Sequence, residues 1–187
     1  MTALLLLPGS DGRSSIWREV ARGLRSAGSD VSTYEGWSRD GLAGQVAAVL
    51  TVCQARNIDS LVTWSYSGLV GSLVAASHGH LSRLVHVDAL LPGFATDGKE
   101  LRELVSPAIM RLLGHDWQLA TAPAAPSCAV GYIECLRRPA KPSFRAVARS
   151  AAVAHGQGFT IHRLPADHRA MTTAPTEVVS LLQVAAT

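Results

Sequence analysis

A serine at the end of a short apolar run is placed where its hydroxyl can act as a nucleophile. Residues 61–64 are apolar or β-branched, Ser65 follows them directly, and a Gly-containing apolar pattern of helical type begins two residues later. A strand that turns at once into a helix holds the intervening serine in a strained conformation and exposes its Oγ. Because a serine hydroxyl attacks a carbonyl carbon only when it is exposed and next to a base, this layout predicts a nucleophile elbow.

The predicted elbow departs from the usual GxSxG pattern at both glycine positions. Thr63 and Ser67 stand two residues before and two residues after Ser65, and Gly68 follows. Small residues are needed there because the strand and the helix pass close to each other across the turn. Ser67 meets that need, whereas Thr63 is β-branched, so an ordinary buried strand that runs into a helix is the alternative interpretation.

Alternating apolar runs and helical patterns surround this stretch. Short apolar or β-branched runs predict strands, while repeats of three to four residues, with a capping signal such as Asp40 and a stop such as Gly28, predict helices. This order predicts a parallel sheet with helices on both faces, an α/β fold, with the whole chain, 1–187, as one domain. The predicted strands cover residues 3–7, 31–34, 60–64, 84–87, 128–135 and 159–163, and the predicted helices cover residues 16–27, 40–50, 67–77, 97–113, 142–154 and 176–186.

The composition indicates a compact globular chain and argues against a nucleic-acid partner. With 187 residues, of which 48% are hydrophobic and 17% charged, the chain is long enough to bury a core and too apolar for disorder. The net charge is +3, and the arginines are scattered without a basic run interleaved with aromatics. The loop PGSDG after the first strand lacks both GK[ST] and GxGxxG, so nucleotide binding is set aside.

Cysteine usage and the apolar segments bear on location. Cys53, Cys128 and Cys135 show no CxxC spacing and cannot all pair, which favours reduced thiols that pack as small apolar residues. The N-terminal run ALLLLP is shorter than a signal-peptide core, and no apolar stretch approaches the ~20 residues of a membrane span. We therefore expect a cytoplasmic protein without a membrane partner.

Four stretches of the chain have an order and spacing that point to one family. They are LLLLPGSDGRSSIWREVARGLRSAG after the first strand, TWSYSG at the elbow, LVHVDALLPG after the next strand, and LPADHRAMTTAPTEVVSLL at the end. Together they touch most of the chain, and it resembles the small α/β-hydrolases of the esterase and hydroxynitrile-lyase branch that have little or no cap. The resemblance implies a mostly parallel sheet with helices on both faces, a reduced cap or lid at about residues 93–127, and no cofactor.

The resemblance also assigns roles to individual residues. His168 follows a strand and precedes a proline-started helix, where this fold carries the general base that accepts the Ser65 proton and returns it to the leaving group. Without the elbow, His168 would be an exposed loop histidine. The backbone N–H groups of Ser10, with Asp11 as the near alternative, and of Tyr66 would form the oxyanion hole.

Another group of histidines suggests a metal site at first sight. His78, His80 and His86 lie close in sequence to Asp88. They straddle the end of a predicted helix and a predicted strand, so a shared ligand shell is not expected. The sequence therefore predicts no metal.

The third member of the triad is where the sequence departs from the family. The usual acid lies in the loop after the penultimate strand, which here reads LRRPAKPSF, and Arg138 stands about where the carboxylate is expected. Asp88, just past the LVHV stretch, is the predicted substitute, because some hydrolases of this fold take the acid from that strand end. The alternatives are a structural Asp88 beside a Ser–His dyad, Glu134, which still lies on its strand and so comes too early for the acid position, and Asp167, which adjoins His168.

These residues predict a serine hydrolase that acts on an ester, thioester or lactone through an acyl-enzyme. One alternative keeps the same serine and histidine but uses them for proton transfer in a lyase or cyclase of a specialised biosynthetic pathway. Another is a non-catalytic member of the fold that binds a small molecule. Because the cap region holds one convincing helix, we expect an open site that suits a bulky or carrier-delivered substrate. The sequence assigns neither the substrate nor an oligomeric state.

Overall fold

A six-stranded, fully parallel sheet forms the centre of the computed structural model, which describes residues 3–139, 141 and 144–184. The strand order is β2-β1-β3-β4-β5-β6, and every neighbouring pair is parallel. Strand β1 reads as a continuous apolar run because both of its faces are buried, and β3 is buried throughout although it contains Ser60 and Thr63. The strands are β1 (Ala3–Leu7), β2 (Asp30–Thr33), β3 (Ser60–Trp64), β4 (Arg83–Val87), β5 (Ala129–Cys135) and β6 (Thr160–Leu164).

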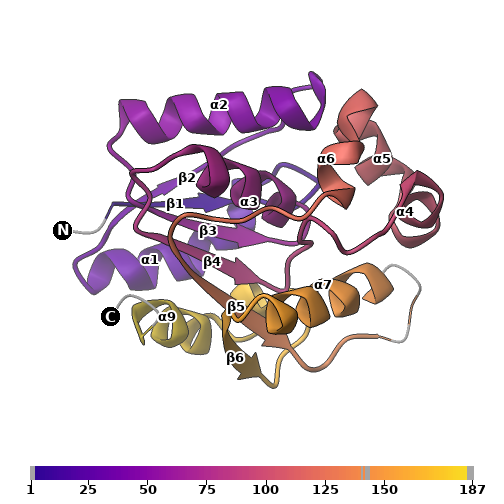
Figure 1. The fold of residues 1–187 in the computed structure, drawn as a ribbon. Coiled ribbons are helices and arrows are strands. Elements are labelled where there is room, and N and C mark those ends of the chain that lie inside the picture. Colours follow the sequence, from indigo (N-terminus) through magenta and orange to yellow (C-terminus); the bar gives the residue numbers. More distant parts are fainter. Residues whose placement is uncertain (1–2, 140, 142–143, 185–187) are drawn as a thin grey trace.

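Helices cover both faces of the sheet, which confirms the predicted α/β class (Figure 1). One apolar cluster joins the sheet to α2 (Gly41–Ala55), α3 (Ser67–Ser77) and the start of α7 (Arg145–Gly156). The opposite cluster joins it to α1 (Arg18–Ser26), α8 (Ala170–Thr173) and α9 (Pro175–Val184). The chain moves outward from β1 to β2 and then crosses back to β3, and in sheets of this topology ligands bind at the carboxyl ends of the strands.

The cap region contains more helix than the sequence predicts. Instead of one helix over residues 97–113, the structure has α4 (Gly98–Leu104) and α5 (Pro107–Leu113), followed by the 3-10 turn η2 (Gly114–Asp116) and α6 (Gln118–Thr121). The prediction of one helix was wrong because Pro107 ends helical continuation, while the Ser106 side chain accepts a hydrogen bond from Ile109 N and starts a new helix. Figure 1 shows α4, α5 and α6 beyond the carboxyl ends of the strands.

Two predicted helix starts also differ from the structure. Asp40 precedes α2 as predicted, but its side chain makes no capping hydrogen bond; Asp116 of the cap accepts one from Ala43 N at 3.0 Å instead. Helix α7 begins at Arg145, and the predicted start at Pro142 lies outside the described residues, as do positions 185–186 of the last helix. The cap is thus tied to the sheet-covering helix α2 by a side chain distant in sequence.

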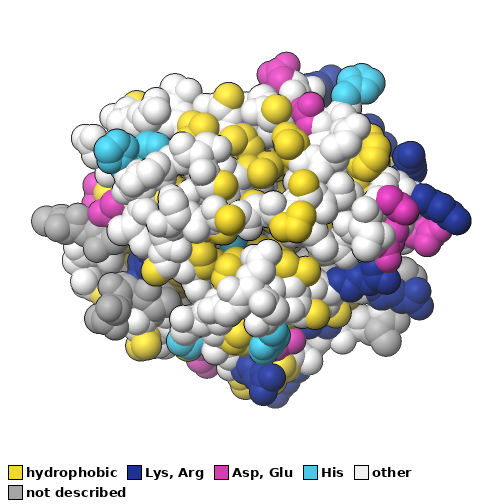
Figure 2. All heavy atoms as spheres, in the orientation of Figure 1, with side chains coloured by type: hydrophobic (Ala, Val, Ile, Leu, Met, Phe, Trp, Pro, Cys, Tyr) yellow, Lys and Arg dark blue, Asp and Glu magenta, His cyan; other side chains and the backbone are white. Residues whose placement is uncertain are grey.

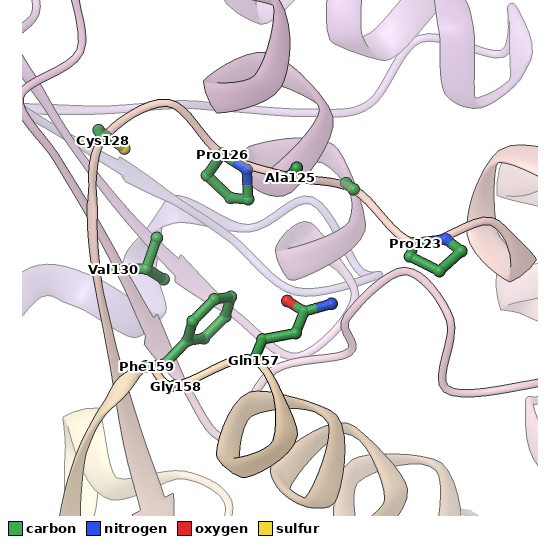
Figure 3. Close-up of a pocket in the computed structure, with 9 residues that line it drawn as sticks. Pro123, Ala125, Pro126, Cys128, Val130, Gln157, Gly158 and Phe159 are labelled. Carbon is green, nitrogen blue, oxygen red and sulfur yellow. The ribbon is translucent and has the colours of Figure 1, made fainter.

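A hollow of about 460 Å³ lies beside the extended segment that joins α6 to β5. Figure 2 shows hydrophobic side chains gathered over this face, and Figure 3 shows Pro123, Pro126, Val130 and Phe159 around the hollow. Its floor is the beginning of β5, the edge of the sheet opposite to Ser65. In the described parts of the chain, no helix is long and apolar enough to cross a membrane.

Candidate active site

Ser65 lies in a tight turn between β3 and α3, with the strained backbone that an elbow requires. Its φ is 56°, one of three positive values among the described non-glycine residues. A side chain at the next-but-two residue, Gly68, would overlap the Leu90 carbonyl oxygen, so only glycine lets α3 start this close to the loop after β4. The hydrogen bond from Leu90 N to Ser65 O, 2.8 Å long, fixes that close approach.

The two residues that replace the usual glycines fit the turn for different reasons. Ser67 is buried, and its Oγ accepts a hydrogen bond from Trp64 N at 2.9 Å, which closes the turn with a side chain. Thr63 points toward α3, where a β-carbon at Gly71 would overlap the Thr63 methyl group. Thr63 is therefore accommodated because Gly71 of α3 leaves room for its methyl group.

Asp88 occupies the equivalent position at the end of the neighbouring strand. Trp64 and Val87, the last residues of β3 and β4, are register partners. Ser65 and Asp88, which directly follow them, therefore lie next to each other at the same edge of the sheet. Asp88 also has a positive φ, 44°, and is completely buried. Its backbone N–H donates to Ile133 O at 2.8 Å, which anchors this second strained residue to β5.

The imidazole of His168 reaches Asp88 from the loop that follows β6. His168 Nδ1 and Asp88 Oδ2 are 2.7 Å apart, although the residues are 80 positions apart in sequence. Trp64 Nε1 donates to the His168 carbonyl oxygen at 2.6 Å, and the rings of Trp64 and Phe144 each lie 5.2 Å from the imidazole. A proton on Nδ1, donated to Asp88, leaves Nε2 as the basic nitrogen of His168.

Arg138 holds the other oxygen of the same carboxylate. Its Nε and one terminal nitrogen lie 2.7 and 2.5 Å from Asp88 Oδ1, and Cys135 N donates to that oxygen at 3.2 Å. Burial disfavours the charged guanidinium, but the hydrogen bonds and charge of Asp88 outweigh this effect and raise the pKa of Arg138. Arg138, at the position where the family carries the acid, thus binds Asp88, the predicted substitute for that acid.

Sequence reasoning located Arg138 but missed this pairing. The available signal was an arginine where the family has an acid, combined with the predicted acid, Asp88, at the end of the preceding strand. The two other candidate acids, Glu134 and Asp167, have partners other than His168. Glu134 lies 3.6 Å from both Arg138 and Arg163, and Asp167 accepts hydrogen bonds from Arg169 N and the Thr173 hydroxyl.

The predicted oxyanion-hole residues lie beside the elbow and in the loop after β1. Neither the Ser10 nor the Tyr66 backbone N–H donates a hydrogen bond to another described residue. The Tyr66 ring is buried, and its hydroxyl donates a hydrogen bond to Gln45 at 2.6 Å. Asp11 instead accepts a hydrogen bond from Arg13 N at 3.2 Å within its own loop.

Ser65 and His168 line the same cavity, which has a volume of about 190 Å³. Its remaining wall is almost entirely apolar and comes from the cap, the loop after β4 and the start of α7. This wall includes Leu90, Leu104, Val105, Ile109, Phe144 and Val147. The arrangement can hold an apolar group next to a serine hydroxyl and an imidazole.

The other histidines discussed above do not gather into a metal site. His86 is buried between β3 and α3, where its Nδ1 contacts Thr63 Oγ1 at 2.7 Å and its Nε2 contacts Ser72 Oγ at 3.4 Å. His78 and His80 contact each other, with ring centroids 5.5 Å apart. Among the residues that the structure describes, no group of three or more His, Cys, Asp or Glu side chains is arranged to hold a metal ion.

The cysteines are free thiols with different degrees of exposure. Cys53 and Cys135 are buried in the two main apolar clusters, and Cys128 is half-buried at the start of β5. Burial raises the pKa of the Cys53 thiol to about 11, so it stays protonated at neutral pH. Cys53 and Cys135 are therefore small core residues, as the sequence predicts, whereas Cys128 lies at the margin of the core.

Several solved structures share this architecture over almost the whole chain. The extracellular α/β-hydrolase from a Paenibacillus species, described as sharing structural and functional homology with tobacco salicylic acid binding protein 2, superposes with a TM-score of 0.71 over 99% of both chains at 16% identity. Tomato methylketone synthase I, solved with 2-tridecanone, gives 0.70 over 99% of this chain and 97% of its own at 14% identity. The chain has the α/β-hydrolase fold.

A third structure with this α/β-hydrolase fold is the NocB thioesterase domain in covalent complex with a fluorophosphonate nocardicin G analogue. It superposes with a TM-score of 0.66 over 99% of this chain and 95% of that domain at 18% identity. No protein-family model matches the sequence, and no curated protein is significantly similar to it. At these identities the likeness establishes the fold, and the chemistry has to be argued from the site itself.

Proposed function

We propose that this α/β-hydrolase-fold chain is a serine hydrolase of esters, thioesters or lactones, with Ser65, His168 and Asp88 as its triad. The observation that carries the proposal is the 2.7 Å hydrogen bond between His168 Nδ1 and Asp88 at the cavity that Ser65 also lines. A histidine oriented by a buried carboxylate and facing a strained serine is the arrangement that activates a hydroxyl. The structural neighbours, which include a thioesterase domain, support this reaction class.

The reaction would proceed through an acyl-enzyme. Ser65 Oγ attacks the carbonyl carbon while its proton passes to His168 Nε2, and the developing oxyanion accepts hydrogen bonds from the Ser10 and Tyr66 amides. The tetrahedral species collapses, and His168 returns the proton to the departing alcohol or thiol. Water then attacks the acyl group with His168 again taking a proton, and the carboxylic acid leaves as Ser65 is restored.

Asp88 would stay ionised throughout this cycle. It accepts the Nδ1–H of His168 and stabilises the imidazolium that forms in each step. Arg138 and Cys135 N fix its second oxygen, so the carboxylate has one orientation to offer the histidine. Arg138 acts as a positioning residue, because it contacts the acid and not the reacting atoms.

The cavity favours a short, apolar acyl group. A volume of about 190 Å³ with a wall of aliphatic and aromatic side chains accommodates a small hydrocarbon chain or ring, and it offers no charge to a charged acyl group. We expect p-nitrophenyl butyrate to be cleaved faster than the acetate, which fills less of the wall, and faster than the palmitate, which does not fit.

Intact-protein mass spectrometry after exposure to a fluorophosphonate tests the proposal. Wild type is expected to gain one adduct, which Ser65→Ala abolishes and which Ser77→Ala, at an exposed position at the end of α3, retains. A wild-type protein that stays unlabelled and inert toward the ester series contradicts hydrolysis. Labelling without ester turnover would instead favour the alternative in which Ser65 and His168 transfer protons in a lyase or cyclase.

A further inference from the structure

Two buried polar atoms without a partner line one cavity on the other side of the molecule. Among the described residues, Arg83 Nε and His162 Nε2 are the buried side-chain nitrogen or oxygen atoms that make no hydrogen bond. Both residues line a cavity of about 260 Å³, together with the beginning of β5, Thr160 and Val184. Buried polar groups nearly always have partners, so two such atoms at one cavity require an explanation.

The sheet register explains why the two side chains face each other. Arg83 pairs with Ala129, and Ile133 pairs with His162, so both side chains project to the face that α9 covers. Between them on β5 lies Gly131, whose missing side chain leaves the floor open. A β-carbon there would lie at an ordinary contact distance, 3.8 Å, from its nearest atoms, so it would fit without a clash.

Arg83 is a buried cation that makes no ion pair with a carboxylate of the described residues. Only 7% of the residue is exposed, and the hydrogen bond that its side chain makes with a described residue runs from a terminal nitrogen to Leu182 O at 3.2 Å. No carboxylate oxygen of a described residue lies within 4.0 Å of it. Asp59 acts from farther away, and its own oxygens accept hydrogen bonds from Ala3 N and Ser60 Oγ. Burial lowers the pKa of Arg83, since an unpaired charge is costly in such a place.

We propose that Arg83 and His162 form a binding site for a small monocarboxylate at the amino-terminal edge of the sheet. The guanidinium edge offers parallel N–H donors that match a carboxylate, and His162 donates in the tautomer that carries its proton on Nε2. One fixed positive charge matches one negative charge, which favours a carboxylate over a phosphate dianion. Ala129, Val130 and Val184 provide apolar contacts for a short hydrocarbon group.

This site is separate from the proposed active site. Arg83 begins β4 and Asp88 follows its end, so the strand places the two sites roughly 16 Å apart along its axis. Binding at the Arg83 site therefore needs neither Ser65 nor His168. Its test does not depend on whether the chain hydrolyses esters.

Histidine imidazole NMR, with benzoate as the probe, tests the site directly. In the full chain, resonances assigned by His162→Gln and His168→Gln report on the two cavities separately. Benzoate is expected to shift the His162 signals in a saturable way, and benzamide, its neutral isostere, to bind at least about tenfold more weakly because it lacks the charge. Inorganic phosphate is expected to bind more weakly than benzoate.

Two variants remove the site by different means. Arg83→Met is expected to weaken benzoate binding by at least about tenfold. Gly131→Val adds apolar volume to the cavity floor without removing either polar group, and its β-carbon would meet no atom closer than 3.8 Å; it is expected to abolish the His162 shift. A benzoate response confined to His168, a preference for phosphate, or an unchanged His162 shift in Gly131→Val would each overturn the proposal.

Discussion

Two histidines of this protein make hydrogen bonds of the same length through Nδ1 yet lie in opposite environments. His168 contacts a carboxylate at 2.7 Å beside an open cavity, whereas His86 contacts the hydroxyl of Thr63 at 2.7 Å in the sealed space under α3. His86 is fully buried and stacks on Phe159, and this burial lowers its pKa to about 3. The comparison shows two features that the proposed base has and His86 lacks: a carboxylate that can stabilise an imidazolium, and a cavity beside the ring where a substrate can bind.

The strongest way to sharpen the comparison is to make the same substitution at both histidines. We expect His168→Gln to lower kcat/KM for a p-nitrophenyl ester on the order of 10⁴-fold or more, because it removes the base. We expect His86→Gln to leave kcat/KM within about threefold of wild type, because its hydroxyl partners are not part of the reaction. Circular dichroism confirms that both variants are folded. Equal losses in the two variants would break the comparison.

A second change tests the charge behind His168. Arg138→Met is expected to lower kcat/KM about 10- to 100-fold, since Asp88 loses two charge-assisted hydrogen bonds. Removal of this cation also leaves the negative charges of Asp88 and nearby Glu134 less compensated. This favours imidazolium, so the acid limb of the pH–rate profile should move to higher pH. Arg138→Lys should restore part of the shift, and a loss of rate with an unchanged profile would indicate a purely structural role.

The smallest expected effect concerns the sealed histidine and acid stability. Between the unfolded pKa of roughly 6.5 and the folded pKa of about 3, the unfolded chain binds the extra proton at His86. The free energy of unfolding should therefore fall as the pH drops through this window, by about 2 kcal/mol from this residue between pH 6.5 and 5.

Urea unfolding at several pH values measures this contribution. His86→Gln should flatten the acid side of the stability curve, whereas His115→Gln, at an exposed position of the cap, should leave it as in wild type. A His86→Gln curve with the wild-type slope would show that His86 is protonated in the folded protein, and the contrast with His168 would be lost.

The local structure around the candidate site was predictable from the sequence because it depends on neighbouring residues. The strand–Ser65–helix layout, the strand over residues 60–64 and the helix over residues 67–77 appear where the pattern predicts them. The Thr63 departure was interpretable only in the structure, since the glycine that makes room for it, Gly71, lies one helical turn into α3. The cap was predicted least well because its short helices depend on caps and packing.

By itself, the sequence determined the alternation of strands and helices, the α/β class, the serine at the turn and the histidine after the last strand. The hydrophobic period and the turn residues depend only on positions close in sequence, so they can be recognised without knowing the tertiary contacts. Only the tertiary structure decided which carboxylate meets His168. Asp88, Glu134 and Asp167 were all available, and the choice depends on the adjacency of β4, β5 and the loop after β6. The pairing of Arg138 with Asp88 across 50 positions has the same cause.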